Sequence, residues 1–136
     1  KSGAVEFLED MKKRGILLGI ATSNDRTIAD AALNARRLTP YFDSVRTACE
    51  VSAGKPAPDV YLKVAEDLQV DPSCCLVFED VPNGILAGKN AGMEVCAVDD
   101  EFSRPLEKEK KQLADYFIHD FNDIFRHTYE RCKKEQ

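Results

Sequence analysis

The 136-residue sequence lacks the features that mark several large classes of protein. Its longest apolar run, residues 16–21, is far shorter than the roughly 20 residues that a membrane-spanning helix needs. The charged residues 1–14 do not resemble a signal peptide. Basic residues are not in excess either, because the formal net charge is −5. The sequence therefore predicts no membrane segment, and it gives no electrostatic reason to bind nucleic acid.

Cysteine pairing is missing as well. The cysteines are odd in number, form no Cys-x-x-Cys pair, and in three cases fall in apolar runs typical of buried strands; they are Cys49, Cys74, Cys75, Cys96 and Cys132. Unpaired thiols of this kind favour a reduced, structural role. Since an oxidising compartment would act against them, we expect a cytoplasmic protein.

The composition is that of a globular protein, with 43% hydrophobic and 32% charged residues. Along the chain, helical patterns alternate with short apolar runs. Strands are predicted at residues 16–21, 44–47, 75–78, 95–98 and 116–118. Continuously apolar strands are typical of a parallel sheet that is covered on both faces.

Amphipathic helices are predicted between these strands. The first carries Ala4, Phe7, Leu8 and Met11 on one side and stops at Gly15; the second begins at Asn24 or Asp25 with a stripe of Ile28, Ala31, Ala32 and Ala35; the third, after Pro58, turns Tyr61, Val64, Ala65 and Leu68 inward. The later helices are predicted from Pro82 to Gly92, over residues 103–113 with a solvated charged face, and over residues 121–132.

This alternation predicts one α/β domain over residues 1–136, with a three-layer, Rossmann-like parallel sheet and helices on both faces. In such sheets, ligands bind at the carboxyl ends of the strands. The residues that directly follow each strand are therefore the candidates for function.

Two of these candidates could bind an anion. Thr22, Ser23 and Asn24 follow the first strand at the entry to a helix, where a hydroxyl and main-chain N–H groups suit an anion; an ordinary helix cap is the alternative. After the second strand, Lys55 stands between Gly54 and Pro56. Lysines in loops are usually solvated, so Lys55 alone is a weak signal.

The third candidate is acidic. Glu79 and Asp80 directly follow the apolar run 75–78. Mg²⁺ prefers one or two carboxylates together with water and substrate phosphate, so this pair suits it. The alternative is a helix N-terminus that is acidic to match the helix dipole. A hydroxyl, a lysine and two carboxylates after three successive strands could together bind a phosphate and a metal ion.

These segments resemble motifs II, III and IV of the haloacid dehalogenase superfamily. The resemblance rests on residues 20–24, on the Lys-Pro-x-Pro-Asp sequence at 55–59, and on the Glu-Asp-x-x-x-Gly-Ile sequence at 79–85 followed by residues 91–93. It runs from about Gly3 to Ile124 and is strongest to the β-phosphoglucomutase-like branch of sugar-phosphate phosphatases and mutases.

The resemblance implies a role for each matched residue. Thr22 would bind the transferring phosphoryl group with its hydroxyl, with Ser23 and Asn24 beside it. Lys55 would bridge the nucleophile and the phosphate, which makes Thr22 and Lys55 the catalytic residues of this chain. Asp80 would ligate Mg²⁺ directly, and Glu79 would support the metal. The implied activity is a Mg²⁺-dependent phosphatase or phosphomutase that acts on a small phosphorylated metabolite through an aspartyl-phosphate intermediate.

The sequence departs from this family in one respect. Family members attack phosphate with the first aspartate of an Asp-x-Asp motif, and this sequence contains no Asp-x-Asp. By this resemblance, we expect the sequence to correspond to the core that follows the cap, without motif I, the central strand or the cap that selects the substrate. A non-catalytic binding or interaction protein is the alternative function. The chain alone is expected to be inactive, and the missing N-terminal segment or another chain is expected to complete the sheet.

Overall fold

A computed structural model describes residues 1–132 of the chain. In chain order, its main elements are α1 (Ala4–Lys13), β1 (Gly19–Thr22), α2 (Arg26–Ala35), β2 (Ser44–Thr47), α3 (Asp59–Leu68), β3 (Leu76–Glu79), α4 (Pro82–Asn90), β4 (Glu94–Val98), α5 (Glu107–Leu113), β5 (Tyr116–Ile118), α6 (Asn122–Phe125) and β6 (Glu130–Arg131). Short 3-10 helices lie between several of them. The alternation of helices and strands is as the sequence predicts.

The strands form two sheets. β1 pairs with β2 in parallel, with Thr22 opposite Thr47. β3, β4 and β5 are parallel to one another, with Glu79 opposite Ala97 and Val98 opposite Ile118, whereas β6 is antiparallel to β5. Within residues 1–132, β1 and β3 are therefore both edge strands.

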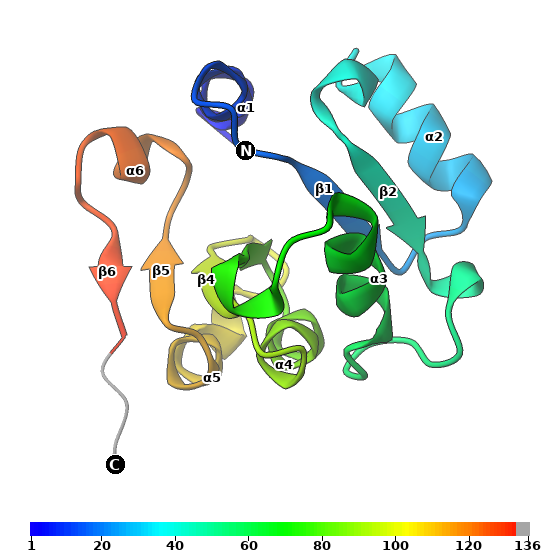
Figure 1. Ribbon diagram of the computed structural model, residues 1–136. Helices are drawn as coiled ribbons and strands as arrows, with labels where there is room; N and C mark the ends of the chain where they lie inside the picture. Colours follow the sequence, from blue (N-terminus) through cyan, green and yellow to red (C-terminus); the bar gives the residue numbers. More distant parts are fainter. Residues whose placement is uncertain (133–136) are drawn as a thin grey trace.

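Helices cover both faces of the strands (Figure 1). α4 and α5 lie below the strands in this view, and α1 and α6 lie above them. α3 packs on β1 and β2, and α4 packs on β3 and β4. Their contacts form the main core, which includes Val60, Val77 and Ile85, all at most 6% exposed. This arrangement confirms the predicted three-layer α/β fold.

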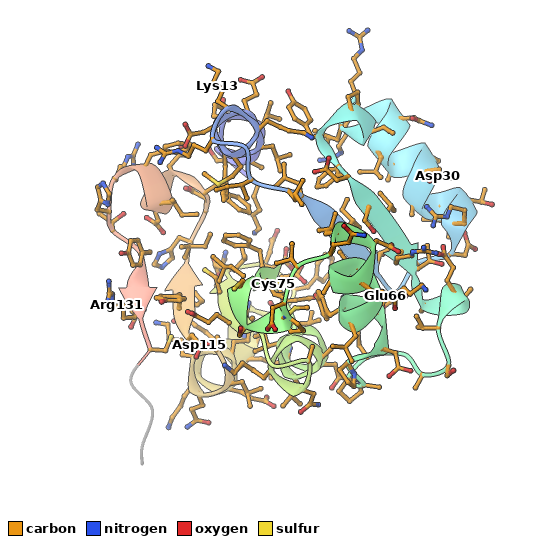
Figure 2. All side chains as sticks on the ribbon, in the orientation of Figure 1. Lys13, Asp30, Glu66, Cys75, Asp115 and Arg131 are labelled. Carbon is orange, nitrogen blue, oxygen red and sulfur yellow. The ribbon has the colours of Figure 1, made fainter. Side chains whose placement is uncertain are left out.

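On the other face of β3, aromatic side chains pack α1 against the sheet. The Phe7 ring of α1 lies edge-on to Phe78 of β3, with ring centroids 5.3 Å apart, and 5.2 Å from Phe121. Charged residues such as Lys13 and Asp30 lie on the outer sides of α1 and α2 (Figure 2). The predicted amphipathic character of α1 is thus confirmed, because Phe7 is its one buried side chain while Glu6 and Glu9 are exposed.

The first predicted strand is too long. Residues 16–18 precede β1, and Ile16 and Leu17 are 46% and 48% exposed. The Ile16 N–H closes α1 on the Met11 carbonyl, and the Leu18 N–H donates to Asp43 Oδ2 at 2.8 Å. These main-chain groups bond outside the ladder between β1 and β2, so strand pairing begins only at Gly19.

The predicted buried face of α2 is also wrong. Ala29 and Leu33 are the buried side chains, whereas Ile28 is 53% exposed. Alanine and leucine at this spacing supply two overlapping apolar stripes, and packing against β2 selects the one that contains Leu33. The predicted cap is confirmed at Asp25, which accepts the Ile28 N–H at 2.9 Å.

The predicted helix over residues 121–132 is replaced by α6 and β6. α6 stops at Phe125 because His127 adopts a left-handed conformation (φ 56°) and Thr128 bonds back to Asp123 through its N–H and its hydroxyl. The chain then pairs with β5, with Glu130 opposite Phe117. The apolar spacing of residues 121–132 matches a helix, but the turn at 127–128 overrides it.

The predicted charged helix over residues 103–113 differs from the structure in where it begins and in the burial of one side chain. α5 begins at Glu107, after a 3-10 turn at Arg104–Leu106, and Lys110 is fully buried instead of solvated.

None of the helices among residues 1–132 is both long and apolar enough to cross a membrane.

Candidate functional site

Lys55 lies at the centre of the candidate site. Its loop is held by main-chain and side-chain bonds: the Ala57 N–H donates to the Gly54 carbonyl at 3.0 Å, and Asn90 Nδ2 donates to the Pro56 carbonyl at 3.0 Å. The Lys55 ammonium donates to the carbonyl oxygen of Ala21 in β1 at 3.0 Å and to Glu79 Oε1. A lysine after β2 thus connects the ends of β1 and β3, as the common carboxyl edge predicts.

Glu79 is the buried acid of the site. It ends β3, is 9% exposed, and accepts hydrogen bonds at Oε1 from both Lys55 and the Tyr61 hydroxyl. The other side of its carboxylate lies against Gly84 in α4, where an added Cβ would overlap Oε2. A buried carboxylate needs partners of this kind, because burying it unpaired is costly. Glu79 is therefore fixed from three sides.

Tyr61 is a site residue that the sequence places only in the core. Its ring lies under the Lys55 ammonium, with 4.9 Å from Nζ to the ring centroid. Burial and the negative charge of Glu79 raise the pKa of the Tyr61 hydroxyl, so it stays protonated and donates. A tyrosine instead of phenylalanine on the inward face of α3 is the signal that could have revealed this role.

Thr22, Ser23 and Asn24 connect β1 to α2. Thr22 is half-buried and its hydroxyl oxygen accepts the Asn24 N–H at 3.1 Å, while Ser23 and Asn24 are exposed. The turn is linked to Lys55 through Ala21, the residue that precedes Thr22. The Thr22 hydroxyl thus shapes its own turn, and the exposed segment lies directly before the capped N-terminus of α2.

Asp80 is exposed and directly follows β3. Its main-chain carbonyl accepts a hydrogen bond from the Ser103 hydroxyl at 2.6 Å. Among residues 1–132 there is no group of three or more His, Cys, Asp or Glu side chains placed to hold a metal ion. The available donors nevertheless suit a hard cation that keeps several waters: Asp80 offers an exposed carboxylate, whereas Glu79 already binds Lys55 and Tyr61.

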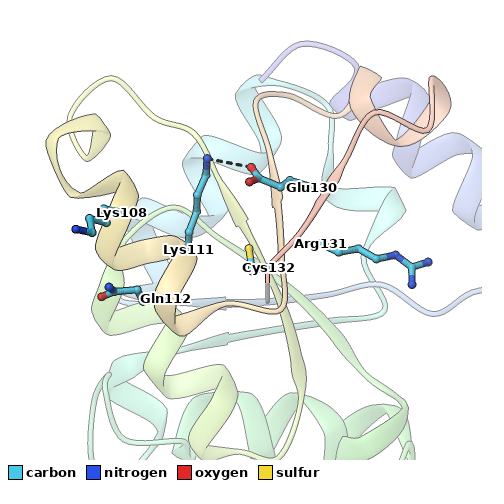
Figure 3. A pocket seen from close by; sticks show the side chains of 6 residues that line it. All are labelled: Lys108, Lys111, Gln112, Glu130, Arg131 and Cys132. Carbon is cyan, nitrogen blue, oxygen red and sulfur yellow. Dashed lines mark ion pairs between the residues drawn. The ribbon is translucent and has the colours of Figure 1, made fainter. Parts of the chain in front are cut away.

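Two cavities lie away from Lys55 and Glu79. One, of about 450 Å³, lies between α5 and β6, where Lys111 pairs with Glu130 at 2.9 Å (Figure 3). The other, of about 470 Å³, is an apolar groove along the sheet face that carries Leu76, Phe78 and Ile118. Neither is lined by Thr22, Lys55 or Asp80.

Comparison with known proteins identifies the family of the chain. The family model of the haloacid dehalogenase-like hydrolases matches residues 1–92. The chain is 42% identical over 91 residues to validoxylamine A 7'-phosphate phosphatase of Streptomyces hygroscopicus subsp. limoneus. This match covers 67% of the chain and 43% of that protein. The chain is also 41% identical over 92 residues to the phosphorylated carbohydrates phosphatase of Thermotoga maritima. This match covers 68% of the chain and 43% of that protein.

The fold is similar to that of a solved phosphomutase. The crystal structure of β-phosphoglucomutase from Clostridium difficile matches with a TM-score of 0.75 and 26% identity, and the match covers 91% of this chain and 54% of that one. The chain thus spans about half the length of these proteins or less.

Proposed function

The chain belongs to the haloacid dehalogenase-like hydrolase family, and we propose that it carries the phosphate- and Mg²⁺-binding residues of a phosphatase or phosphomutase. The proposed substrate is a small phosphorylated metabolite such as a sugar phosphate, which is the class named for two of its relatives. One observation carries this proposal: the Lys55 ammonium is held by Ala21 and Glu79 at the carboxyl ends of β1 and β3.

Each residue has a defined part in the proposal. The Thr22 hydroxyl, with Ser23 and Asn24, would contact the phosphoryl oxygens at the start of α2, where main-chain N–H groups favour an anion. Lys55 would neutralise charge on the transferring group. Glu79 would hold Lys55 in place and support the metal site. Phosphoryl transfer depends mainly on such positioning and charge stabilisation.

Asp80 is the proposed ligand of Mg²⁺, because it is the exposed carboxylate beside Glu79. When bound, Mg²⁺ would neutralise the negative charge that develops on the phosphate oxygens. The proposed attacking group is an aspartate that would form an aspartyl-phosphate intermediate. It would have to come from outside these 136 residues, which contain no Asp-x-Asp motif. We favour hydrolysis over mutase activity.

The test is phosphate release from a panel of sugar phosphates by the intact protein, across a Mg²⁺ titration. Asp80→Asn should lower turnover by at least about 100-fold, since the metal supplies several kcal/mol of charge stabilisation. Asp30→Asn, which removes the same charge from the exposed face of α2, is the control and should change little. Turnover that is independent of Mg²⁺ and of Asp80 would contradict the assignment.

A non-catalytic binding protein is the second candidate, and the missing Asp-x-Asp motif favours it. It predicts phosphate binding that depends on Lys55, without turnover in the intact protein. The 136-residue chain by itself should release no phosphate from p-nitrophenyl phosphate under either proposal. An aspartyl-phosphate adduct on this chain, detected by mass spectrometry, would show that the catalytic residues have been misassigned.

We also propose a cytoplasmic location. The support is that Cys49 and Cys74 are exposed thiols without a disulfide bond in the structure. Exposed unpaired thiols are typical of a reducing compartment.

A further inference from the structure

Lys110 is a fully buried lysine that the proposed chemistry does not use. It lies on α5, and its ammonium donates to the Val98 carbonyl at 2.6 Å and to Ser103 Oγ at 2.8 Å. Among residues 1–132, no carboxylate lies within 4.0 Å of it to form an ion pair. Burial lowers the pKa of this ammonium. A methionine would fill similar space without the cost of burying a charge, so the donor groups of Lys110 need an explanation.

The contacts of Lys110 lead to the candidate metal ligand. Ser103 is 3% exposed, and its hydroxyl donates to the main-chain carbonyl of Asp80 at 2.6 Å. An ammonium can only donate and a carbonyl can only accept. With Lys110 protonated, Ser103 must therefore accept from Lys110 and donate to Asp80. The directions of the hydrogen bonds from Lys110 to Ser103 and from Ser103 to Asp80 are therefore fixed.

One end of this hydrogen-bond network, Val98, lies in the sheet, and the other, Asp80, directly follows a strand. Val98 is the last residue of β4, and β4 pairs directly with β3, whose end leads into Asp80. Lys110 thus ties the end of β4 to the loop that carries the Asp80 carboxylate. Glu79, one residue earlier, is fixed separately by Lys55 and Tyr61. Two independent sets of contacts therefore hold the two neighbouring acids.

We propose that Ser103 and Lys110 are positioning residues for Asp80: they hold its main chain so that its exposed carboxylate is presented to a divalent cation. This inference rests on the proposed function, in which Asp80 binds Mg²⁺. Groups that orient a metal ligand typically contribute 10- to 100-fold to metal affinity. Neither residue would touch the metal or the substrate.

The metal readout is the Mg²⁺ dissociation constant of the intact protein, measured by isothermal titration calorimetry. Ser103→Ala, which removes the hydroxyl without changing charge, should weaken Mg²⁺ binding about tenfold. Ser103→Thr keeps the hydroxyl and should restore binding to within about twofold of the unaltered protein. A purely structural role predicts no such difference, so a Ser103→Ala affinity within twofold of the unaltered protein would overturn the proposal.

A second readout needs no metal. In hydrogen exchange, Ser103→Ala and Lys110→Met should both speed exchange in residues 80–85 several-fold, while exchange in α2 stays unchanged. Lys108→Met removes the same charge from the exposed side of α5 and is the matched control. If Lys110→Met does not fold, Ser103→Ala decides alone. Unchanged exchange in residues 80–85 would overturn the positioning role.

The two readouts separate this proposal from the proposed function. If the unaltered protein and Asp80→Asn bind Mg²⁺ equally, or neither binds it, the assignment of Asp80 as a metal ligand fails. Hydrogen exchange then still shows whether Ser103 and Lys110 hold the Asp80 segment. If Asp80 binds Mg²⁺ but Ser103→Ala leaves either readout unchanged, the proposed function stands and this inference fails.

Discussion

Lys55 forms an ion pair with Glu79 although the strand before Lys55 and the strand that contains Glu79 belong to different sheets. Lys55 follows β2, in the first sheet, and Glu79 ends β3, in the second. Their side chains are only 12% and 9% exposed, so solvent screens the pair weakly. Because the same ammonium also bonds to Ala21, this one side chain joins the two sheets at the site where phosphate would bind.

Lys55→Met should lower the free energy of unfolding of the intact protein by about 3 kcal/mol, because it leaves a buried carboxylate without its cation. Lys55→Met combined with Glu79→Gln should cost less than the sum of the two single changes. Urea unfolding measures all three variants. Lys63→Met, on the exposed side of α3, is the control and should stay within about 0.5 kcal/mol. Additive effects would mean that the pair contributes no coupling energy.

Tyr61→Phe tests the second partner of Glu79. Loss of this buried hydrogen bond to a charged group should cost about 1.5–3 kcal/mol, and it should also weaken phosphate binding because Glu79 then holds Lys55 less firmly. Tyr41 offers a matched control, since its hydroxyl donates to Glu9 on the protein surface. Equal losses of stability in Tyr61→Phe and Tyr41→Phe would argue against a special role for Tyr61.

Gly84→Ala tests the third side of the Glu79 carboxylate. The added methyl group would overlap Oε2, so the carboxylate must move and Lys55 must move with it. We expect a loss of about 1–3 kcal/mol in stability together with weaker phosphate binding. Gly54→Ala is the control, because nothing lies within 4 Å of its added Cβ. Both properties can be measured on the same samples, by urea unfolding and by calorimetry with inorganic phosphate.

The placement of Lys55 beside the end of β3 could be predicted from sequence, because parallel strands bring their carboxyl ends to one edge. The partners of Glu79 could not. An apolar face shows only that Tyr61 points inward, and its hydroxyl meets Glu79 only because α3 packs across β1 and β2. The burial of Lys110 could not be predicted for a related reason. A run of alternating charges is typical of a solvated helix, and the burial of Lys110 depends on how α5 packs.

The fold was predictable where several signals agreed. α4 begins with Pro82 at its first position and is closed by Gly92 at φ 81°, a conformation that suits glycine. Both predicted ends of this helix are therefore confirmed. The region after Ile118 was not predictable from periodicity. Its apolar residues have helical spacing, but hydrogen bonds from His119 and Thr128 to Asp123 close a turn that directs the chain into β6.

Acid should weaken a cluster of charges beside the site. Arg46 of β2 bonds to Asp67 of α3 through Nε and Nη2, at 2.6 and 2.9 Å. The Arg46 guanidinium and the Ser44 hydroxyl lower the pKa of Asp67 to about 2, below the ordinary value of about 4. A lowered folded-state pKa gives stability that is present above pH 4 and lost as the pH falls toward 2.

Asp67→Asn should therefore be less stable than the unaltered protein at pH 6 and nearly equal to it near pH 2. The difference at pH 6 should be about 1 kcal/mol or less, because the pair lies at the surface. Urea unfolding at several pH values between 6 and 2 measures it. Glu66→Gln, an exposed neighbour on α3, is the control. A difference that stays constant with pH would show that Asp67 acts through packing and not through its charge.

The edges of β1 and β3 lead to a prediction about the 136-residue chain on its own. Within residues 1–132, each of these strands has a partner on one side only, and Ile16, Leu17 and Leu76 nearby are 46–51% exposed. Each main-chain group that is buried without a partner costs about 1–3 kcal/mol, against a usual total stability of about 5–15 kcal/mol. We expect a further segment or a second chain to pair with these edges.

The isolated chain should therefore show either low stability or association that depends on concentration. Urea unfolding combined with sedimentation at several concentrations distinguishes these states from a stable monomer. Leu76→Lys places a charge beside the open edge of β3 and should reduce association, because charged side chains oppose edge pairing. Leu62→Lys, at an exposed leucine of α3, is the matched control. A cooperative, concentration-independent transition from a monomer of ordinary stability would contradict the prediction, since it would show that the open edges of β1 and β3 need no partner.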